Sequence, residues 1–550
     1  MQIGEIETMT KPTEGAKESS RRRYWWSRNW FYTALISIAV IGSFCAFCLP
    51  LLIAEPFSAG DSVAALRHAI LAATGGILAM LTLWENRRKN LQEKDKNDLD
   101  HARQVKAERR SRYAKAIEQL ADDKSTVRLG GIYTLAKLAD EWLSDDKTLP
   151  NEDNRTEEAQ IIVNSLCSYI RSPFPLAEKR ELYKAIKDTS DYDGNFFADQ
   201  FKLREEQEIR RTIFEEMSKR LSKISAVDRA IKIEKANGDT EYIQSSKDFI
   251  VIPGTWSHLE YDFSYSQIFY SLNNLSLESP NFKNSTFHER ACFASARFAG
   301  NTNFNSAHFE GEIDFSNSIF SHKADFSNSH FCQEANFLKT CFKEASFRLS
   351  VFEKSASFQW STFVKMPSFY RSKFCGSADF LESIFENGAH FMESEFEIID
   401  QDKDKIQFDC SFYGGNSSFA GAIFRGPTFF NGAIFTNETS FHKTRFVNET
   451  DFHNSKSRKK FDTKKREKTT GKLLFSQASF QYPAIHDFRV ATDSPTLINM
   501  GVVDFTLFDG TTIRRSIPVD SYLFELSPPD KENKRDINMS GASEPIEDSE

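Results

Sequence analysis

The chain has 550 residues, enough for about two to four domains, and carries a net charge of −8 at pH 7. An acidic chain has no general affinity for nucleic acid, so we expect no specific nucleic-acid partner. The eight cysteines show no disulfide framework, and free thiols indicate a reducing compartment.

Residues 1–20 are polar, and we predict that they are disordered. Residues 21–89 read as a transmembrane hairpin, because two apolar runs, 30–54 and 63–84, each have the length that crosses a bilayer core of about 30 Å. Arg21, Arg22, Arg23 and Arg28 precede the first run, and Trp25, Trp26, Trp30 and Tyr32 lie where an aromatic belt anchors a span.

The charges around the hairpin predict its orientation. Glu55 and Asp61 lie in the short connection, which has no Lys or Arg, while Arg87, Arg88 and Lys89 follow the second run. The positive-inside rule then places both ends in the cytoplasm. A secretory signal peptide and a buried hairpin of a soluble domain are the rival interpretations.

Small residues in the second run favour close packing against the first. Ala72, Gly75, Gly76 and Ala79 have small-x-x-x-small spacing.

Residues 90–223 are predicted to form a helical linker and a helical module. The charged stretch from Glu85 to about Ala121 lacks Gly and Pro, which indicates a long helix leaving the membrane, and this helix could self-associate. Shorter amphipathic helices follow, and Ser125 is placed to cap the first of them. Gly130-Gly131 indicates a close helix contact rather than a phosphate loop, since no strand precedes it.

Phenylalanine recurs between Asn281 and Phe452 at spacings that alternate between five and six residues. The positions are Phe282, Phe287, Phe293, Phe298, Phe304, Phe309, Phe315, Phe320, Phe326, Phe331, Phe337 and Phe342, then after one slip Phe347, Phe352, Phe358, Phe363, Phe369, Phe374, Phe380, Phe385, Phe391 and Phe396, and after an interruption Phe419, Phe424, Phe430, Phe435, Phe441, Phe446 and Phe452. A fixed internal period decides the fold before any other signal.

A second position supports the same register. The residue two before each Phe is nearly always small, as at Ala296, Ser318 and Ala324, with Ile313 and Pro367 as exceptions. Two inward positions two residues apart fit a short strand, whereas steps of five and six make no stripe on a helix. The Phe residues are therefore predicted to be core.

This pattern resembles the pentapeptide-repeat family in its Phe-centred form. The resemblance implies a right-handed quadrilateral β-helix, with four faces and 22 residues in each coil. Residues 281–452 would make roughly eight coils and a rod of roughly 37 Å, with Phe stacked on Phe. The stretches Tyr113–Leu120, Val127–Leu135 and Leu166–Phe174 look like the helical module that precedes the repeats in bacterial membrane proteins of this family.

The remaining boundaries follow from composition. Residues 224–255 are predicted to be a polar linker, and 256–480 the solenoid, with insertions at 397–409 and 455–472. The second insertion has nine Lys or Arg against two acids, and a solvated disordered loop is favoured over a site for anionic lipid, RNA or an acidic partner. Apolar residues alternate over 486–526 around Asp509-Gly510, which predicts a hairpin, and residues 481–526 are expected to cap the rod. Residues 527–550 read as a disordered acidic tail.

No residue pattern points to metal or redox chemistry. Cys45 and Cys48 lie in an apolar run without partners. Cys292, Cys332, Cys341 and Cys375 fall on outward repeat positions without ligand-like clustering, and the rod histidines His288, His308, His322, His330 and His390 are predicted to be solvated. Asp400, Asp402 and Asp404 lack the Gly and Glu of a calcium loop.

The sequence therefore predicts a non-enzyme with no catalytic, cofactor-binding or metal-binding residues and no cofactor. It contains no Walker loop, Gly-x-Ser-x-Gly or His-Glu-x-x-His, and a Phe-filled rod offers no pocket. We expect an integral protein of the bacterial cytoplasmic membrane with both termini cytoplasmic. It would contact the bilayer through residues 30–84 and display its solenoid as a scaffold to an unidentified protein partner. Whether the chain forms a homo-oligomer stays an open question.

Two alternatives come from other classes. The first alternative is a DNA-mimic regulator of a topoisomerase, because soluble members of the family that protect DNA gyrase are acidic rods resembling a DNA duplex. Residues 258–455 hold 24 Asp or Glu against 16 Lys or Arg, which is only mildly acidic. A membrane effector acting through the hairpin is the other, although Arg67 and His68 are the only ionisable side chains in the spans besides thiols and Tyr32.

Overall fold

The computed structural model describes residues 31–48, 52, 63–179, 192, 194–235, 238–288, 291–397, 405–462, 467–529 and 535–545. The chain divides into two compact units, Met1–Ala107 and Glu108–Glu550. The predicted disordered residues 1–20 and the triplet Asp400, Asp402 and Asp404 lie outside the described residues.

The first unit contains two helices that are long and apolar enough to cross a membrane: Phe31–Cys48 and α2 (Val63–Leu120). They run antiparallel, because Lys89 Nζ lies 3.4 Å from the hydroxyl of Tyr32 and Arg67 lies over the ring of Phe47. Their apolar side chains are exposed, with Phe44 at 65% and Met80 at 69%. Such exposure does not fit the rival interpretation of a hairpin buried inside a soluble domain.

The predicted packing of small residues was wrong in its details. A Cβ added to Gly75 or Gly76 would meet nothing within 4 Å. The close approach between the two helices is instead at Gly42, where a Cβ would lie 2.3 Å from Cγ2 of Thr74. The first helix therefore supplies the small residue.

The second unit begins with the end of α2, which confirms the predicted long helix, and continues as a helical module. Its helices are α3 (Ser125–Ser144), α4 (Glu152–Arg171), α5 (Pro175–Glu178) and α7 (Phe196–Ser218). Ser125 does not cap α3; Lys124 holds the cap position, and the Ser125 hydroxyl donates to Glu205 Oε1 at 2.7 Å. The predicted glycine contact is confirmed at Gly131, where a Cβ would lie 2.9 Å from the carbonyl oxygen of Ala116.

The helical module closes the first end of the solenoid. Phe214 of α7 packs on Phe263 with a centroid distance of 4.7 Å, so one apolar core runs from the helices into the coils. Arg210, which is 1% exposed, donates to Glu206 at 2.6 Å and to the carbonyl oxygen of Ile170, and its guanidinium lies over Phe269. A buried charge so fully hydrogen-bonded is one that the fold can accommodate.

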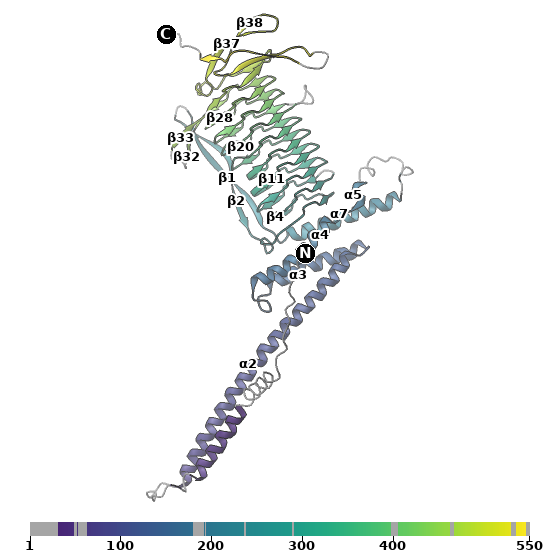
Figure 1. Cartoon of the computed structure of the whole chain (residues 1–550), viewed down its shortest axis with the longest axis vertical. Coiled ribbons are helices and arrows are strands. Elements are labelled where there is room, and N and C mark those ends of the chain that lie inside the picture. The colour runs from purple at the N-terminus through teal and green to yellow at the C-terminus, as the bar shows by residue number, and fades with distance from the viewer. Residues whose placement is uncertain are drawn as a thin grey trace, which may run out of the picture. The chain divides into compact units, whose positions relative to one another are not determined.

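The rest of the unit is mainly a β-solenoid, with about eight turns over residues 281–452 (Figure 1). Its short strands pair in parallel with the strand one turn away, and each turn crosses four ladders in chain order.

The first ladder consists of β3 (Gln267–Ile268), β5 (Thr286–Phe287), β9 (His308–Phe309), β12 (His330–Phe331), β15 (Val351–Phe352), β18 (Lys373–Phe374), β21 (Glu395–Phe396), β25 (Ile423–Phe424), β29 (Arg445–Phe446) and β35 (Ser479–Gln481). The second ladder consists of β6 (Ala291–Cys292), β10 (Ile313–Asp314), β13 (Ala335–Asn336), β16 (Ala356–Ser357), β19 (Ala378–Asp379), β22 (Ile406–Gln407), β26 (Thr428–Phe429), β30 (Thr450–Asp451) and β36 (His486–Asp487).

The third ladder consists of β4 (Ser276–Glu278), β7 (Arg297–Ala299), β11 (Ile319–Asp325), β14 (Cys341–Ser346), β17 (Thr362–Phe363), β20 (Ile384–Phe385), β23 (Phe412–Tyr413), β27 (Ile434–Phe435) and β31 (Lys456–Ser457). The fourth ladder consists of β8 (Thr302–Asn303), the ends of β11 and β14, β24 (Ser417–Ser418), β28 (Glu438–Ser440), β34 (Lys472–Leu474) and single bridges such as Ser368 to His390.

The predicted aromatic ladder is confirmed. Phe315, Phe337 and Phe358 are fully buried and stack nearly parallel, with centroid distances of 5.3 and 4.7 Å. The slip in the Phe spacing is absorbed by the strands: β14 has six residues where β11 has seven, and their pairing shifts register between Phe320 and Lys323. Phe326 still stacks on Phe347 at 5.0 Å.

Residues 224–255, predicted to be a polar linker, form a β-hairpin instead. Strands β1 (Lys223–Glu234) and β2 (Thr240–Ile252) pair antiparallel and lie against the third ladder (Figure 1). Ile224 contacts a cluster with Ile319 and Cys341, and Ile231 one with Ile384. The prediction failed because the apolar residues of this segment alternate among many charged ones.

Both predicted insertions are shorter than expected. Ile406 and Phe408 already belong to the coil, with Phe408 stacked between Phe380 and Phe430 at 5.0 and 4.7 Å. In the basic segment 455–472 most described residues lie in β31, β32 (Lys459–Asp462) and β33 (Glu467–Thr470), and Lys472 begins β34. Strand β32 pairs with β33 and with the end of β1. The favoured disordered loop is therefore wrong for these residues.

The predicted C-terminal hairpin is confirmed as β37 (Met500–Thr506) and β38 (Thr512–Pro518). Strand β39 (Tyr522–Leu526) pairs in parallel with β35 and so covers the last edge of the first ladder. Two short strands fall in the predicted disordered tail: β40 (Ile537–Met539) pairs with β39, and β41 (Glu544–Pro545) pairs with β37.

Candidate functional site

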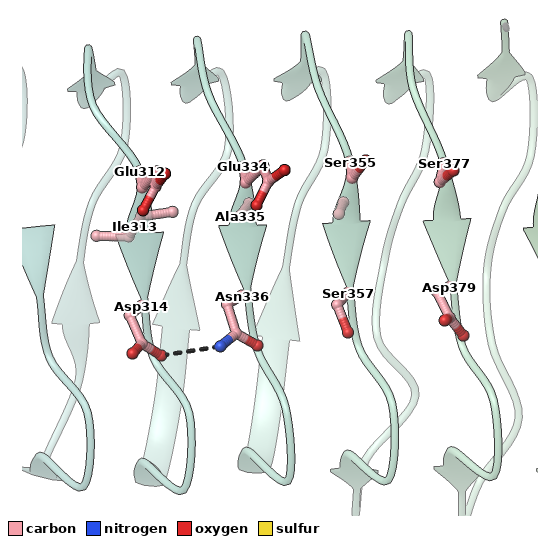
Figure 2. A pocket seen from close by; sticks show the side chains of 11 residues that line it. Glu312, Ile313, Asp314, Glu334, Ala335, Asn336, Ser355, Ser357, Ser377 and Asp379 are labelled. Carbon is pink, nitrogen blue, oxygen red and sulfur yellow. Dashed lines mark hydrogen bonds between the residues drawn. The ribbon is translucent and has the colours of Figure 1, made fainter. Parts of the chain in front are cut away.

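The outer surface of the solenoid holds the candidate site, because the Phe residues fill the interior. A groove of about 280 Å³ runs across β10, β13, β16 and β19 of the second ladder (Figure 2). It is lined by Glu312, Ile313, Asp314, Glu334, Ala335, Asn336, Ser355, Ala356, Ser357, Ser377 and Asp379.

The groove is acidic. Four of its lining side chains are carboxylates, and among these described lining residues none is Lys, Arg or His. Figure 2 shows Glu312 and Glu334 at the same position of neighbouring turns, which are about 4.8 Å apart. Such repetition concentrates negative charge along one side, and the arrangement suits cationic groups.

Part of this charge has a structural role. Asp314 accepts the amide N–H of Ser316 at 2.9 Å and the side-chain amide of Asn336 at 3.1 Å. Asp379 accepts the N–H of Leu381 at 2.9 Å in the same way. These bonds hold the turn after each strand, so the aspartates fix the coil as well as charging the groove.

The acidic character continues past the groove. Burial raises the pKa of Asp409 to about 6, and the carboxylates of Asp451 and Asp379 raise it further, although the N–H of Asn431 acts in the opposite direction. Asp409 and Asp451 therefore add two carboxylates to the second ladder beyond the groove.

A larger pocket of about 780 Å³ lies on the helical module, outside the Phe-filled rod for which no pocket was predicted. Its lining combines cations and acids, including Arg155, Lys219, His258 and Glu152. Asp140 occupies its wall, where it accepts two bonds from Arg220 and one from the indole of Trp256, each at 2.9 Å. These bonds to Arg220 and Trp256 already offset much of the negative charge of Asp140.

The rod histidines differ in exposure: His322 is exposed as predicted, whereas His308, His330 and His390 are half-buried and His288 is buried. His288 is 7% exposed, and its Nδ1 lies 2.7 Å from Glu310. Burial lowers the pKa of His322 and of His390, and nearby Lys343 and Arg348 act in the same direction. Cys341 is buried, because the β1–β2 hairpin covers its outward position.

One group among the described residues could hold a metal ion: His308, His330 and Cys332, whose donor atoms all lie within 4.8 Å of one another. The prediction that the rod cysteines do not cluster with ligands was wrong for Cys332. Burial raises the pKa of the Cys332 thiol, and the carboxylates of Glu353 and Glu310 raise it further. The signal was in the sequence, since His308 and His330 are 22 residues apart, which is one coil.

Comparison with known families supports the repeat assignment. Residues 282–330 match the family model of pentapeptide repeats, in nine copies. This segment is a pentapeptide-repeat array. The comparisons with curated proteins and with solved structures give no match. The pentapeptide-repeat solenoid is a fold compatible with protein interaction, since it offers long regular outer faces.

Proposed function

We propose that this protein is a membrane-anchored, non-enzymatic scaffold that binds a partner protein along the acidic groove of its solenoid. The observation that carries the proposal is the groove across β10–β19, where Glu312, Glu334 and Asp379 present carboxylates on a rigid, solid-cored coil. A partner surface bearing Lys or Arg is its complement. We infer, from the family resemblance, that the coil is right-handed and quadrilateral.

The anchor part of the proposal rests on the exposed apolar surface of the first unit. Helix Phe31–Cys48 and the start of α2 expose Ile36, Phe44 and Leu83, which water would solvate poorly. We propose that they cross the bacterial cytoplasmic membrane, with both termini in the cytoplasm. Deletion of residues 31–84 would then release the chain from membranes, whereas extraction of the intact chain by alkaline carbonate would refute the anchor.

The groove is tested by changing one carboxylate that holds no turn. Glu334→Lys reverses charge at the centre of the groove, and Glu438→Lys makes the same change on an exposed position of β28 as the control. Cross-linking in membranes from cells that express each full-length variant should give one shared partner for the native chain and Glu438→Lys. Glu334→Lys should reduce its yield at least about fivefold. Equal yields for all three would refute the groove as the binding surface.

The DNA-mimic alternative is less favoured by the charge distribution. Other outward positions carry cations next to acids, such as Lys365 at 2.7 Å from Glu344 and Arg371 at 2.6 Å from Glu393. Negative charge is therefore not continuous around the coil, as it is around a DNA duplex. Capture of a topoisomerase in the cross-linking experiment would revive this alternative.

A further inference from the structure

Two histidines and a cysteine meet on the first ladder of the solenoid, on the outer side of β9 and β12. His308 and His330 occupy paired positions on consecutive turns, directly before Phe309 and Phe331. Cys332 follows Phe331. We propose that His308, His330 and Cys332 form a binding site for one Zn²⁺ ion, which goes beyond the scaffold function.

The distances fit this metal. Cys332 Sγ lies 3.6 Å from His308 Nε2. Bonds of about 2.3 Å to sulfur and about 2.05 Å to nitrogen at a tetrahedral angle place these two atoms roughly 3.5 Å apart. The three donor atoms all lie within 4.8 Å of one another, so the longest separation must shorten by at most roughly 1.4 Å, which rotation of a partly exposed imidazole can supply.

The backbone that carries the ligands is rigid. The N–H of His330 donates to the carbonyl oxygen of Ala307 at 3.0 Å, and that of Cys332 to Phe309 at 2.9 Å. Beneath them Phe309 and Phe331 are fully buried and stack at 4.7 Å. A site on such a framework loses little conformational freedom when the ion binds.

The surroundings also suit a cation. Glu353 lies on the next turn, and its Oε1 is 2.6 Å from His330 Nε2. Imidazoles that bind zinc usually donate their other N–H to a carboxylate of this kind, so Glu353 would position His330. Thiolate and imidazole ligands together select Zn²⁺ over Mg²⁺ or Ca²⁺. Three protein ligands leave a fourth position for water.

Binding would release a proton. The Cys332 S–H bond breaks as the sulfur–zinc bond forms, and the proton passes to the buffer, so about one proton leaves for each ion bound at neutral pH. The sulfur keeps its electron pair and no redox step occurs.

The test is zinc titration of the detergent-solubilised full-length chain after treatment with a chelator. We expect one Zn²⁺ per chain at this site, and at least about 100-fold weaker binding in Cys332→Ser, His308→Ala and His330→Ala, because even loss of an outer partner costs about 10–100-fold. Cys375→Ser is the matched control: Cys375 follows Phe374 on the same ladder, but Lys373 stands where His330 stands before Phe331. It should bind as the native chain does.

Cobalt gives a second, spectroscopic readout. Co²⁺ in the native chain should show a thiolate-to-cobalt charge-transfer band and the intense visible bands of tetrahedral coordination. The band should persist in Cys375→Ser and disappear in Cys332→Ser. No charge-transfer band in the native chain, or unchanged zinc binding in Cys332→Ser, as expected if Cys45 and Cys48 hold the ion, would overturn the proposal.

Discussion

At the scale of single residues, His486 is a titratable group that makes the stability of the end of the solenoid depend on pH. Its Nε2–H donates to the carbonyl oxygen of Gln481 at 2.9 Å, and its ring packs edge-on against Phe480. Burial lowers the pKa of His486 to about 4, although the bond to Gln481 acts in the opposite direction. The folded chain therefore holds this imidazole neutral.

We predict that acid loosens the C-terminal cap through His486. The folded pKa of about 4 lies below the unfolded value of about 6.5, so the stabilisation is complete above pH 6.5 and is lost as the pH falls towards 4. The loss is at most roughly 3 kcal/mol. The protection factors of the amides in β35 and β39, which correct for the slower intrinsic exchange in acid, should fall between pH 6.5 and 4.5.

His486→Gln keeps a donor for Gln481 but does not titrate, so it should flatten this pH dependence. His442→Gln, on another part of the coil, should leave it unchanged. An identical pH profile for His486→Gln and the native chain would show that a different group loosens the cap.

At the scale of elements, the β1–β2 hairpin buries outward positions of the third ladder that would otherwise face solvent. Ile319, Cys341 and Ala299 point away from the Phe core, yet they are buried because Ile224 and the partly buried Phe249 and Val251 cover them. The ion pair between Arg229 and Glu386, at 2.6 Å, holds the hairpin farther along the coil. A second, smaller core therefore lies outside the solenoid.

We predict that the thiol of Cys341 is protected from alkylation until the hairpin detaches. Burial raises its pKa to about 11, so both access and thiolate fraction are low at pH 8. Peptide-resolved labelling with N-ethylmaleimide should modify the exposed Cys410 first. Ile224→Ser should accelerate the labelling of Cys341 at least about tenfold and leave the labelling rate of Cys410 unchanged. Equal rates for the two thiols in the native chain would contradict this covering role.

The elements that follow a strict period could be predicted, and those that depend on contacts between distant segments could not. The Phe repeat predicts the coil and its stacking, because each Phe meets its equivalent one turn later. The β1–β2 hairpin was missed because its apolar residues, such as Ile231 and Ile233, are few among many charged residues. The residues on which they pack also lie more than 100 positions away in the sequence. Phe408 was missed because the interruption before it broke the spacing.

The candidate sites follow the same division. The acidic residues of the groove and the ligands of the proposed zinc site sit on outward positions, where the repeat leaves residue type free. Their grouping appears only when the chain is aligned at the length of one coil, as for His308 and His330. Even then Cys332 lies two residues beyond the position paired with His308 on the neighbouring turn, and a position-by-position alignment does not reveal this diagonal contact.

At the scale of the whole molecule, one aromatic core extends from α7 through the coils to the C-terminal strands. Phe214 contacts Phe263 at one end, and Phe452 stacks on Phe488 at 5.9 Å near the other. Each coil nevertheless touches mainly its two neighbours, as in other repeat proteins, whose stability is a sum of repeat and neighbour contributions. A destabilising substitution in a central coil should therefore loosen only the coils next to it, if the more distant coils remain folded.

We predict that Phe337→Ala weakens only the turns around it. Phe337 stacks on Phe315 and Phe358 at 5.3 and 4.7 Å and is fully buried, so truncation should cost about 3–5 kcal/mol, whereas Phe337→Leu should cost roughly 1–2. Hydrogen exchange should rise in residues 313–363, and protection should stay native in residues 419–452. Equal loss of protection from 256 to 526 would instead mean that the solenoid, with its helical and C-terminal ends, unfolds as one cooperative unit.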